Sequence, residues 1–193
     1  IMGKKGNWII DADIEGFFNN VDHQWMAKCL EQRISDPNFK WLIRRFLKAG
    51  VLEEGIQAKT KKGTAQGGIV SPVLANIYLH YVLDLWHERV IKRKTRGYTQ
   101  LVRYADDFII GVQYKEEAEQ LLKEMSIRLK KFGLTLSREK TSIKEFGRFA
   151  TENRKRRGER KPETFDFLGF THYCTNTQDK RFMVRVKTSR RRV

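Results

Sequence analysis

The sequence predicts an α+β domain in which an antiparallel sheet is covered on one face by helices. Apolar runs of strand type flank the adjacent acids Asp106 and Asp107, which is the pattern of a tight hairpin with the acids at its turn. Another strand-like run lies near the start of the chain, at residues 7–14. The helical patterns between these runs each carry one apolar stripe, and one face of a single sheet accommodates them all.

Two helices are expected after the first strand. Apolar residues recur at helical spacing over residues 23–49. Asp36-Pro37 divides this stretch, because proline disfavours a helix interior and suits its first turn. Asp22 has the side chain and the place of an N-cap for the first helix. Residues 51–63 then suggest a hairpin or loop with a basic centre.

A third helix is expected after the glycine-rich turn at residues 63–72. Ser71 is the expected cap and Pro72 the first helical residue. Its buried face begins at Val73 and continues to Trp86, and the basic residues 92–94 suit its last turn.

The most regular amphipathic pattern runs from Lys115 to Phe132, with Gly133 as the stop signal. We expect short strands at residues 134–136 and 141–143, on either side of a polar turn that contains Lys140.

The C-terminal part contains a basic stretch without apolar residues at 154–162, which predicts an exposed loop. This loop is either simply solvated or in contact with an RNA backbone, and the net charge favours contact. Two strand-like runs, at residues 164–170 and 182–186, complete the expected elements.

Composition indicates a globular protein with a polyanionic partner. The 193 residues carry a formal net charge of +16. A surplus of this size points to nucleic acid ahead of an anionic membrane surface, and no apolar run approaches the ~20 residues of a membrane span. Cys29 and Cys174 are far apart and show neither disulfide nor zinc-site spacing, so we expect reduced thiols and a cytoplasmic protein.

Acidic residues lie at the ends of two expected strands. Asp13 ends the first strand, and Asp106 and Asp107 form the hairpin turn. If these strands are neighbours, the carboxylates converge in a way that suits two divalent ions ~3.5–4 Å apart, as in two-metal phosphoryl transfer. The simpler alternative is that the acids are ordinary turn and cap residues. Asp11 is either a residue that supports the metal ligands or a solvated or salt-bridged acid, and the second interpretation is favoured.

Four motifs in order resemble the palm of reverse transcriptases encoded by group II introns and their bacterial relatives. They are residues 13–18 (DIEGFF), 65–79 (AQGGIVSPVLANIYL), 103–108 (RYADDF) and 165–170 (FDFLGF). The resemblance extends from about Trp8 to Phe170. It implies a polymerase palm fold over residues 1–186, with residues 187–193 as the start of a link to a thumb or maturase region. It also implies a bacterial protein.

The resemblance assigns catalytic and metal-binding roles. Asp13, Asp106 and Asp107 match the catalytic aspartates, and the main-chain carbonyl of Ile14 would complete the shell of one metal. Lys140 resembles the lysine near the triphosphate, a candidate proton donor to pyrophosphate. The implied cofactors are two Mg²⁺ ions, for which Mn²⁺ can substitute.

The nucleotide and primer contacts follow from the same resemblance. Phe18 matches the side chain that excludes a 2′-hydroxyl group, and Gln66 and Gly67 match residues at the incoming nucleotide. The primer-gripping hairpin is implied at Phe167, Leu168 and Gly169. Ala65 stands where the family usually has proline. We expect the fingers segment, which precedes the palm in the family, to lie outside these 193 residues, and we do not expect the palm to polymerise alone.

The function implied is RNA-directed DNA polymerisation: attack of a primer 3′-hydroxyl on a deoxynucleoside triphosphate. The expected partners are an RNA template, a DNA or RNA primer, deoxynucleoside triphosphates and intron RNA. The alternative is an RNA-binding maturase-type module that assists splicing without polymerising. A third interpretation, RNA-templated RNA synthesis, is disfavoured by Phe18 and by Ala105 before the acids.

Overall fold

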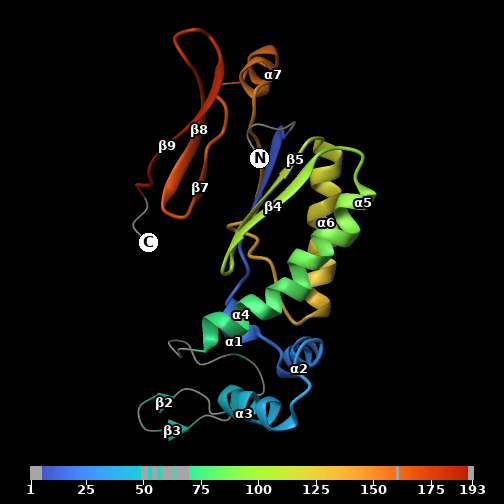
Figure 1. The fold of residues 1–193 in the computed structure, drawn as a ribbon. Helices are drawn as coiled ribbons and strands as arrows, with labels where there is room; N and C mark the ends of the chain where they lie inside the picture. Colours follow the sequence, from blue (N-terminus) through green and yellow to red (C-terminus); the bar gives the residue numbers. More distant parts are fainter. Residues whose placement is uncertain are drawn as a thin grey trace.

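A computed structural model describes residues 6–48, 52–53, 56–57, 63, 70–159 and 161–190. Its centre is a four-stranded antiparallel sheet with strand order β4-β5-β1-β6 (Figure 1). These strands are β1 (Trp8–Ala12), β4 (Thr99–Tyr104), β5 (Asp107–Val112) and β6 (Ser142–Glu145). The predicted first strand and the predicted hairpin are therefore confirmed, and they are direct neighbours.

The helices follow the sequence pattern closely. The N-terminal helices are α1 (Phe17–Asn20), α2 (His23–Glu31) and α3 (Pro37–Lys48). One long helix then contains α4 (Ser71–Leu79), two π-helical turns (His80–Asp84 and His87–Ile91) and α5 (Lys92–Lys94). The remaining helices are α6 (Lys115–Lys131) and α7 (Ala150–Arg156). In the described part of the chain, no helix is long and apolar enough to cross a membrane.

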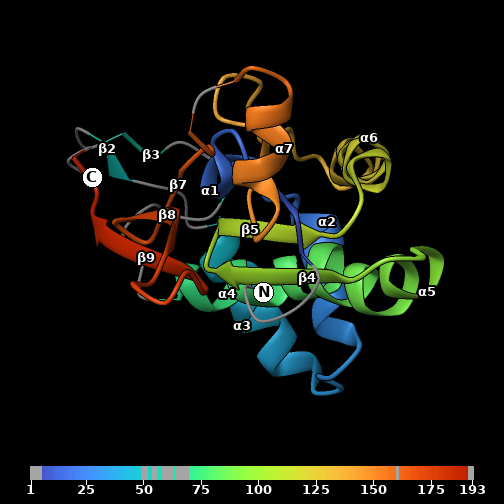
Figure 2. The ribbon, with the colours of Figure 1, turned by 90° about the horizontal axis from the view of Figure 1, so that it is seen from above.

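A second antiparallel sheet lies on the other side of the central sheet from α6 (Figures 1 and 2). It consists of β7 (Phe165–Phe167), β8 (Phe170–Asn176) and β9 (Phe182–Thr188). Two strands were expected here, and the structure has three. A separate pair of short strands, β2 (Leu52–Glu53) and β3 (Ile56–Gln57), forms the hairpin expected between the second and third helices.

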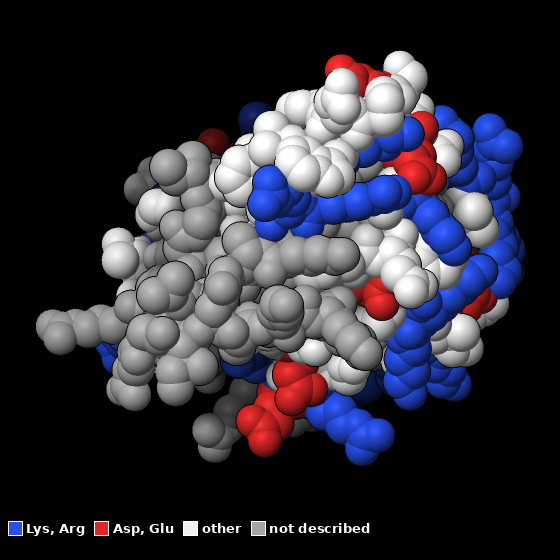
Figure 3. All heavy atoms as spheres, turned by 90° about the horizontal axis from the view of Figure 1, so that it is seen from below, with Lys and Arg blue, Asp and Glu red and all other residues white. Residues whose placement is uncertain are grey.

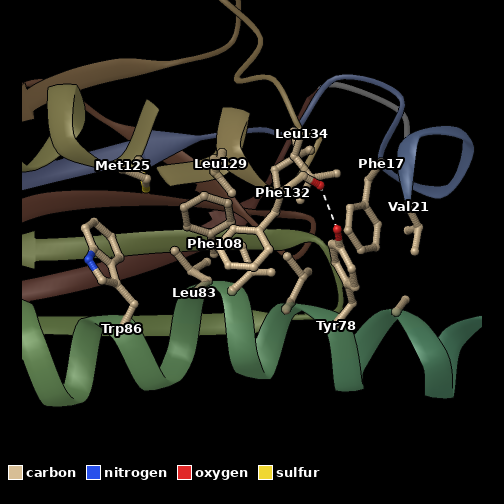
Figure 4. Packing of buried hydrophobic residues seen from close by; sticks show 14 of the residues in the cluster. Phe17, Val21, Tyr78, Leu83, Trp86, Phe108, Met125, Leu129, Phe132 and Leu134 are labelled. Carbon is tan, nitrogen blue, oxygen red and sulfur yellow. Dashed lines mark hydrogen bonds between the residues drawn. The ribbon is translucent and has the colours of Figure 1, made fainter. Parts of the chain in front are cut away.

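Alternation along β1 and β5 directs apolar side chains to both faces of the central sheet. Ile10 and Phe108 belong to the main core under the helices, where the long helix and α6 pack against the sheet (Figure 4). Ile9 and Ile109 face the opposite way and pack with Phe165 of the second sheet. The prediction of helices on one face is therefore confirmed, and part of the other face is covered by strands.

A buried hydrogen bond fixes the long helix against the end of α6. The hydroxyl of Tyr78 donates to the main-chain carbonyl of Phe132 at 2.6 Å, and both residues lie in the core (Figure 4). The Asp22 carboxylate caps α2 by accepting from the N–H groups of Gln24 and Trp25, as predicted.

Three local predictions are wrong. The long helix begins at Ser71 itself, with Val70 at the cap position, and Val73 is 58% exposed rather than buried. The short strand expected at 134–136 is reduced to one bridge between Leu136 and Ile14.

The basic stretch expected to be a loop begins inside a helix, because α7 extends to Arg156. Acidic residues nearby neutralise part of its charge. Arg157 forms ion pairs with Glu159 and with the buried Glu145, and Arg154 lies 3.2 Å from Glu159. These side chains stabilise the local fold and are therefore less available to RNA than their charge suggests.

The π-helical turns place a histidine in the core. His87 is 1% exposed, and its Nε2 atom lies 3.0 Å from the hydroxyl of Thr99 on β4. The pKa of His87 is lowered to about 4, mainly by burial and also by the charge of Lys92, while Glu88 and Asp84 act in the opposite direction. The ring is therefore neutral in the folded protein at neutral pH.

We expect the free energy of unfolding to decrease as the pH is lowered from about 6.5 to about 4. In this window the unfolded chain protonates His87 and the folded chain does not, so protons favour unfolding. The difference between an ordinary pKa of 6.5 and one of about 4 corresponds to about 3 kcal/mol. Urea unfolding of the original chain and of His87→Gln across this range measures it. An equal pH slope in both proteins would contradict the prediction.

Candidate active site

Strand register brings the two acidic segments together. Ala12 pairs with Phe108 across β1 and β5, and Tyr104 pairs with Asp107 across the hairpin. The next position after Ala12 is Asp13, which therefore comes opposite Asp107. The convergence of the strand-end acid and the hairpin acids, predicted from the sequence, follows from this register.

The pKa of Asp107 records the crowding of these carboxylates. Desolvation raises the pKa of Asp107 above its usual value, a hydrogen bond from the Leu168 main chain lowers it, and the charges of Asp11, Asp106 and Asp13 raise it further. Four carboxylates therefore share one region at the edge of the sheet. Mutual repulsion of this kind is relieved by a cation.

In this structure, lysines supply the positive charge. Lys140 Nζ lies 3.1 Å from Asp13 Oδ2, and Lys144 Nζ lies 2.6 Å from Asp11 Oδ2. The Asp11 pair confirms the expectation of a salt-bridged acid. Lys140 is placed beside the acid cluster, although its expected contact with a triphosphate stays a prediction.

The donor atoms suit a divalent cation in kind, because hard cations prefer carboxylate oxygens. Among the residues the structure describes, however, no three His, Cys, Asp or Glu side chains are arranged to hold a metal ion. Asp11, Asp13 and Asp106 are close enough to raise the pKa of Asp107. Because Lys140 Nζ lies 3.1 Å from Asp13 Oδ2, a cation bound to that oxygen would displace Lys140.

The segment after α6 supports Asp13 and Ile14 from the main chain. The N–H of Ser137 donates to the carbonyl of Asp13 at 2.9 Å, and the N–H of Glu15 donates to the carbonyl of Thr135 at 2.9 Å. These bonds flank the bridge between Ile14 and Leu136. The position of Asp13 is therefore fixed from two sides, by β5 and by this segment.

Arg103 holds the acid-bearing turn to the long helix, a role that the sequence pattern did not reveal. Its guanidinium forms a two-bond fork with Asp84, with Nε–Oδ1 at 2.8 Å and Nη2–Oδ2 at 2.7 Å. Nη1 donates to Asn76 Oδ1 at 2.8 Å and to the carbonyl of Ala105 at 2.7 Å. The Arg103 side chain is only 11% exposed. We name Arg103, Asp84 and Asn76 the arginine clamp.

The clamp acts on a strained turn. Ala105 has φ 52, a left-handed conformation that costs a non-glycine residue about 1–2 kcal/mol. Asp106 follows it directly, so the backbone of Ala105 sets the direction of the first acid. The hydrogen bond from Arg103 to the Ala105 carbonyl opposes relaxation of this turn.

Phe18 lies in α1, half-buried and packed edge-on against Phe17 with ring centroids 5.3 Å apart. Gly63 is docked beside it: its N–H donates to the Val21 carbonyl, and an added Cβ would lie 3.1 Å from the Phe18 carbonyl oxygen. The glycine-rich turn therefore begins next to Phe18. The predicted nucleotide contacts Gln66 and Gly67 lie outside the described residues.

The predicted primer-gripping residues form the turn between β7 and β8. Phe167 is the last residue of β7, and Leu168 and Gly169 both have positive φ. The main chain of Leu168 hydrogen-bonds Asp107, so this turn lies directly against the acid cluster. Its role toward a primer stays a prediction.

Comparison with known proteins decides the family. The profile described as "Reverse transcriptase (RNA-dependent DNA polymerase)" matches residues 2–172. The chain belongs to the reverse transcriptase family. Members of this family use divalent metal ions.

Curated relatives include proteins encoded by group II introns. The chain is 34% identical over 194 residues to "Group II intron-encoded protein LtrA" of Lactococcus lactis, covering 70% of this chain and 32% of that protein. It is 30% identical over 145 residues to "Protein YkfC" of Escherichia coli, covering 62% and 38% respectively. The chain thus spans about a third of the length of these relatives.

Solved structures of telomerase share the fold. The structure of apo telomerase from Candida tropicalis, truncated from the C-terminal domain, superposes with a TM-score of 0.63 at 17% identity, over 94% of this chain and 35% of that one. Telomerase from Candida albicans, in complex with a fragment of telomeric RNA, gives a TM-score of 0.61 at 15% identity, over 96% and 31%.

We expect strong energetic coupling within the arginine clamp. Arg103→Gln and Asp84→Asn should each lower the free energy of unfolding by about 1.5–3 kcal/mol, because each leaves a partly buried charge without its partner. The double variant should cost less than the sum of the two. The exposed pair of Arg44 and Glu31, at 3.4 Å, is the matched control and should couple by less than about 1 kcal/mol. Additive effects at Arg103 and Asp84 would contradict the clamp.

Proposed function

We propose that this chain is the catalytic palm of an RNA-directed DNA polymerase from a group II intron-type element. The observation that carries the proposal is the convergence of Asp13 with Asp106 and Asp107 at the edge of the sheet. Family membership and the likeness to group II intron-encoded proteins support it. Because the chain spans about a third of those relatives, polymerisation is proposed for the longer protein that contains it.

The acid cluster would hold the divalent ions. Asp13, Asp106, Asp107 and the carbonyl of Ile14 are the proposed ligands, with two Mg²⁺ ions as the proposed occupants. Bound ions would activate the primer hydroxyl and stabilise the leaving group. The chain itself positions the carboxylates through the β1–β5 register and the arginine clamp. When Lys140 is released from Asp13, it is free to place its proton near the pyrophosphate.

Nucleotide and primer would approach the acids from neighbouring elements. Phe18 and the turn containing Gln66 and Gly67 are the proposed contacts of the incoming deoxynucleotide. Phe167, Leu168 and Gly169 are the proposed contacts of the primer, and the bond from Leu168 to Asp107 gives them a direct connection to the acids.

An RNA template fits the surface charge. The chain has a formal net charge of +16, and Lys and Arg side chains gather along one side of the face seen from below (Figure 3). The telomerase of similar fold from Candida albicans was solved with an RNA fragment. A DNA or RNA primer and intron RNA are further proposed partners.

We expect Asp106→Ala to reduce primer extension by more than about 100-fold. Removing a direct metal ligand should exceed the 10–100-fold loss typical of residues that only support a ligand. Extension is measured on an RNA template with a longer polypeptide that joins this chain to the flanking segments of the Lactococcus lactis relative. Template binding should change little.

Asp179→Ala removes an exposed carboxylate outside the acid cluster and is the charge-matched control. Retained extension by Asp106→Ala would refute the polymerase proposal. Loss of extension in both variants would show that the assay reports folding or net charge. Splicing assistance that persists in Asp106→Ala, without extension by the original chain, would instead favour the maturase-type alternative.

Phe18→Ala should relax discrimination between sugars. If the Phe18 ring excludes the 2′-hydroxyl, its removal should raise ribonucleotide incorporation relative to deoxynucleotide incorporation by about tenfold or more. The ratio of kcat/KM for the two nucleotides measures this effect. Phe149→Ala removes a 51% exposed ring elsewhere and should leave the ratio unchanged. An unchanged ratio in Phe18→Ala would assign Phe18 to packing alone.

A further inference from the structure

A cavity with basic side chains in its wall lies outside the acid cluster. It has a volume of about 390 Å³ and is enclosed by α6 on one side and by the segment from Thr135 to Thr141 on the other. None of the proposed metal, nucleotide or primer residues lines it. We call it the α6 pocket.

Positive charge in the α6 pocket is unbalanced. Its wall contains Lys123, Lys130 and Arg138, and no acidic residue. All three cations are exposed, and none forms an ion pair with another residue in the described ranges. Lys123 and Lys130 are seven residues apart on α6 and so share one helix face. By contrast, Arg154 and Arg157, in the basic stretch after α7 begins, form ion pairs with Glu159.

Hydroxyl groups accompany these cations. Ser126, Thr135, Ser137 and Thr141 all line the pocket. The Thr141 hydroxyl is buried and has no hydrogen-bond partner among the described residues. Cations together with hydroxyl donors form the usual surroundings of a phosphate group.

The floor of the pocket is apolar, because Leu122 and Leu136 also contribute to it, both half-buried. A free inorganic anion would gain nothing from this floor. A nucleotide of an RNA strand matches both the basic wall and the apolar floor. Its phosphate can reach the cations while its sugar and base cover the leucines.

We propose that the α6 pocket binds a phosphate group of an RNA strand, with the adjoining nucleoside against Leu122 and Leu136. This site goes beyond the proposed polymerase function, because strand binding here needs neither the acids nor a metal. An RNA strand bound in the pocket would also contact the segment that supports Asp13. Ser137 lines the pocket and also donates its N–H to the carbonyl of Asp13.

The test measures RNA binding by the whole chain without catalysis. Fluorescence anisotropy follows a labelled short single-stranded RNA over a salt series, with EDTA present so that metal at the acids contributes nothing. The test variant is Lys123→Gln/Lys130→Gln/Arg138→Gln. We expect its Kd at low salt to rise about tenfold. The slope of log K against log salt should become shallower by about 0.7 for each phosphate that the variant no longer neutralises.

The control variant is Arg33→Gln/Arg89→Gln/Arg93→Gln, which removes the same charge at exposed positions that do not line the pocket. Its Kd should change much less. Equal weakening in both triple variants would overturn the proposal, because it would show a general effect of net charge. Circular dichroism and thermal unfolding should be unchanged in both, since all six side chains lie on the surface.

Inorganic pyrophosphate distinguishes a strand from a free anion. Calorimetric titration with pyrophosphate should give weak binding, and pyrophosphate should compete poorly with RNA. If the test variant loses pyrophosphate binding but retains its RNA affinity, the pocket is a free-anion site and the proposal is wrong. Failure of primer extension would leave these binding results unaffected, so the two proposals fail independently.

Discussion

The antiparallel register between β1 and β5 is the constraint on which the site depends. A shift by one residue would reverse the face of every side chain in β1. Ile10 would leave the main core and Ile9 would leave its contact with the second sheet, so burial on both faces opposes any shift. The same register sets Asp13 opposite Asp107. Hydrophobic packing on two faces thus specifies the position of acids that contribute nothing to that packing.

Holding these acids together is electrostatically unfavourable, and the structure offsets the cost with several separate groups. Lys140 and Lys144 pair with Asp13 and Asp11, and the Leu168 main chain binds Asp107. Arg103 lies beside the turn, but its guanidinium binds the carboxylate of Asp84. Arg103 therefore holds the turn in place and does not neutralise the acids of the cluster. The lysine at Asp13 is exposed and is therefore the more readily exchanged cation.

The sequence was sufficient for elements whose signals are local. The hairpin at Asp106, the cap at Asp22 and the break at Pro37 each depend on residues within a few positions of one another. The arginine clamp could not be predicted in this way, because Arg103 and Asp84 are 19 positions apart. Asp84 also lies in a π-helical turn, which changes the residues that share a helix face, whereas sequence periodicity assumes 3.6 residues per turn. His87 lies in the other π-helical turn, so the apolar periodicity of the sequence did not indicate its burial either.

The end of α6 connects the core to the site. The Tyr78 hydroxyl holds the Phe132 carbonyl, and Leu134 is buried two residues later. The chain leaves the core at Thr135, bonds to Glu15 and Asp13, and reaches Lys140. A displacement of α6 would therefore move the main-chain support of Asp13 together with its lysine. The position of Asp13 thus depends on the packing of Phe132 and Leu134, through the short segment that follows them.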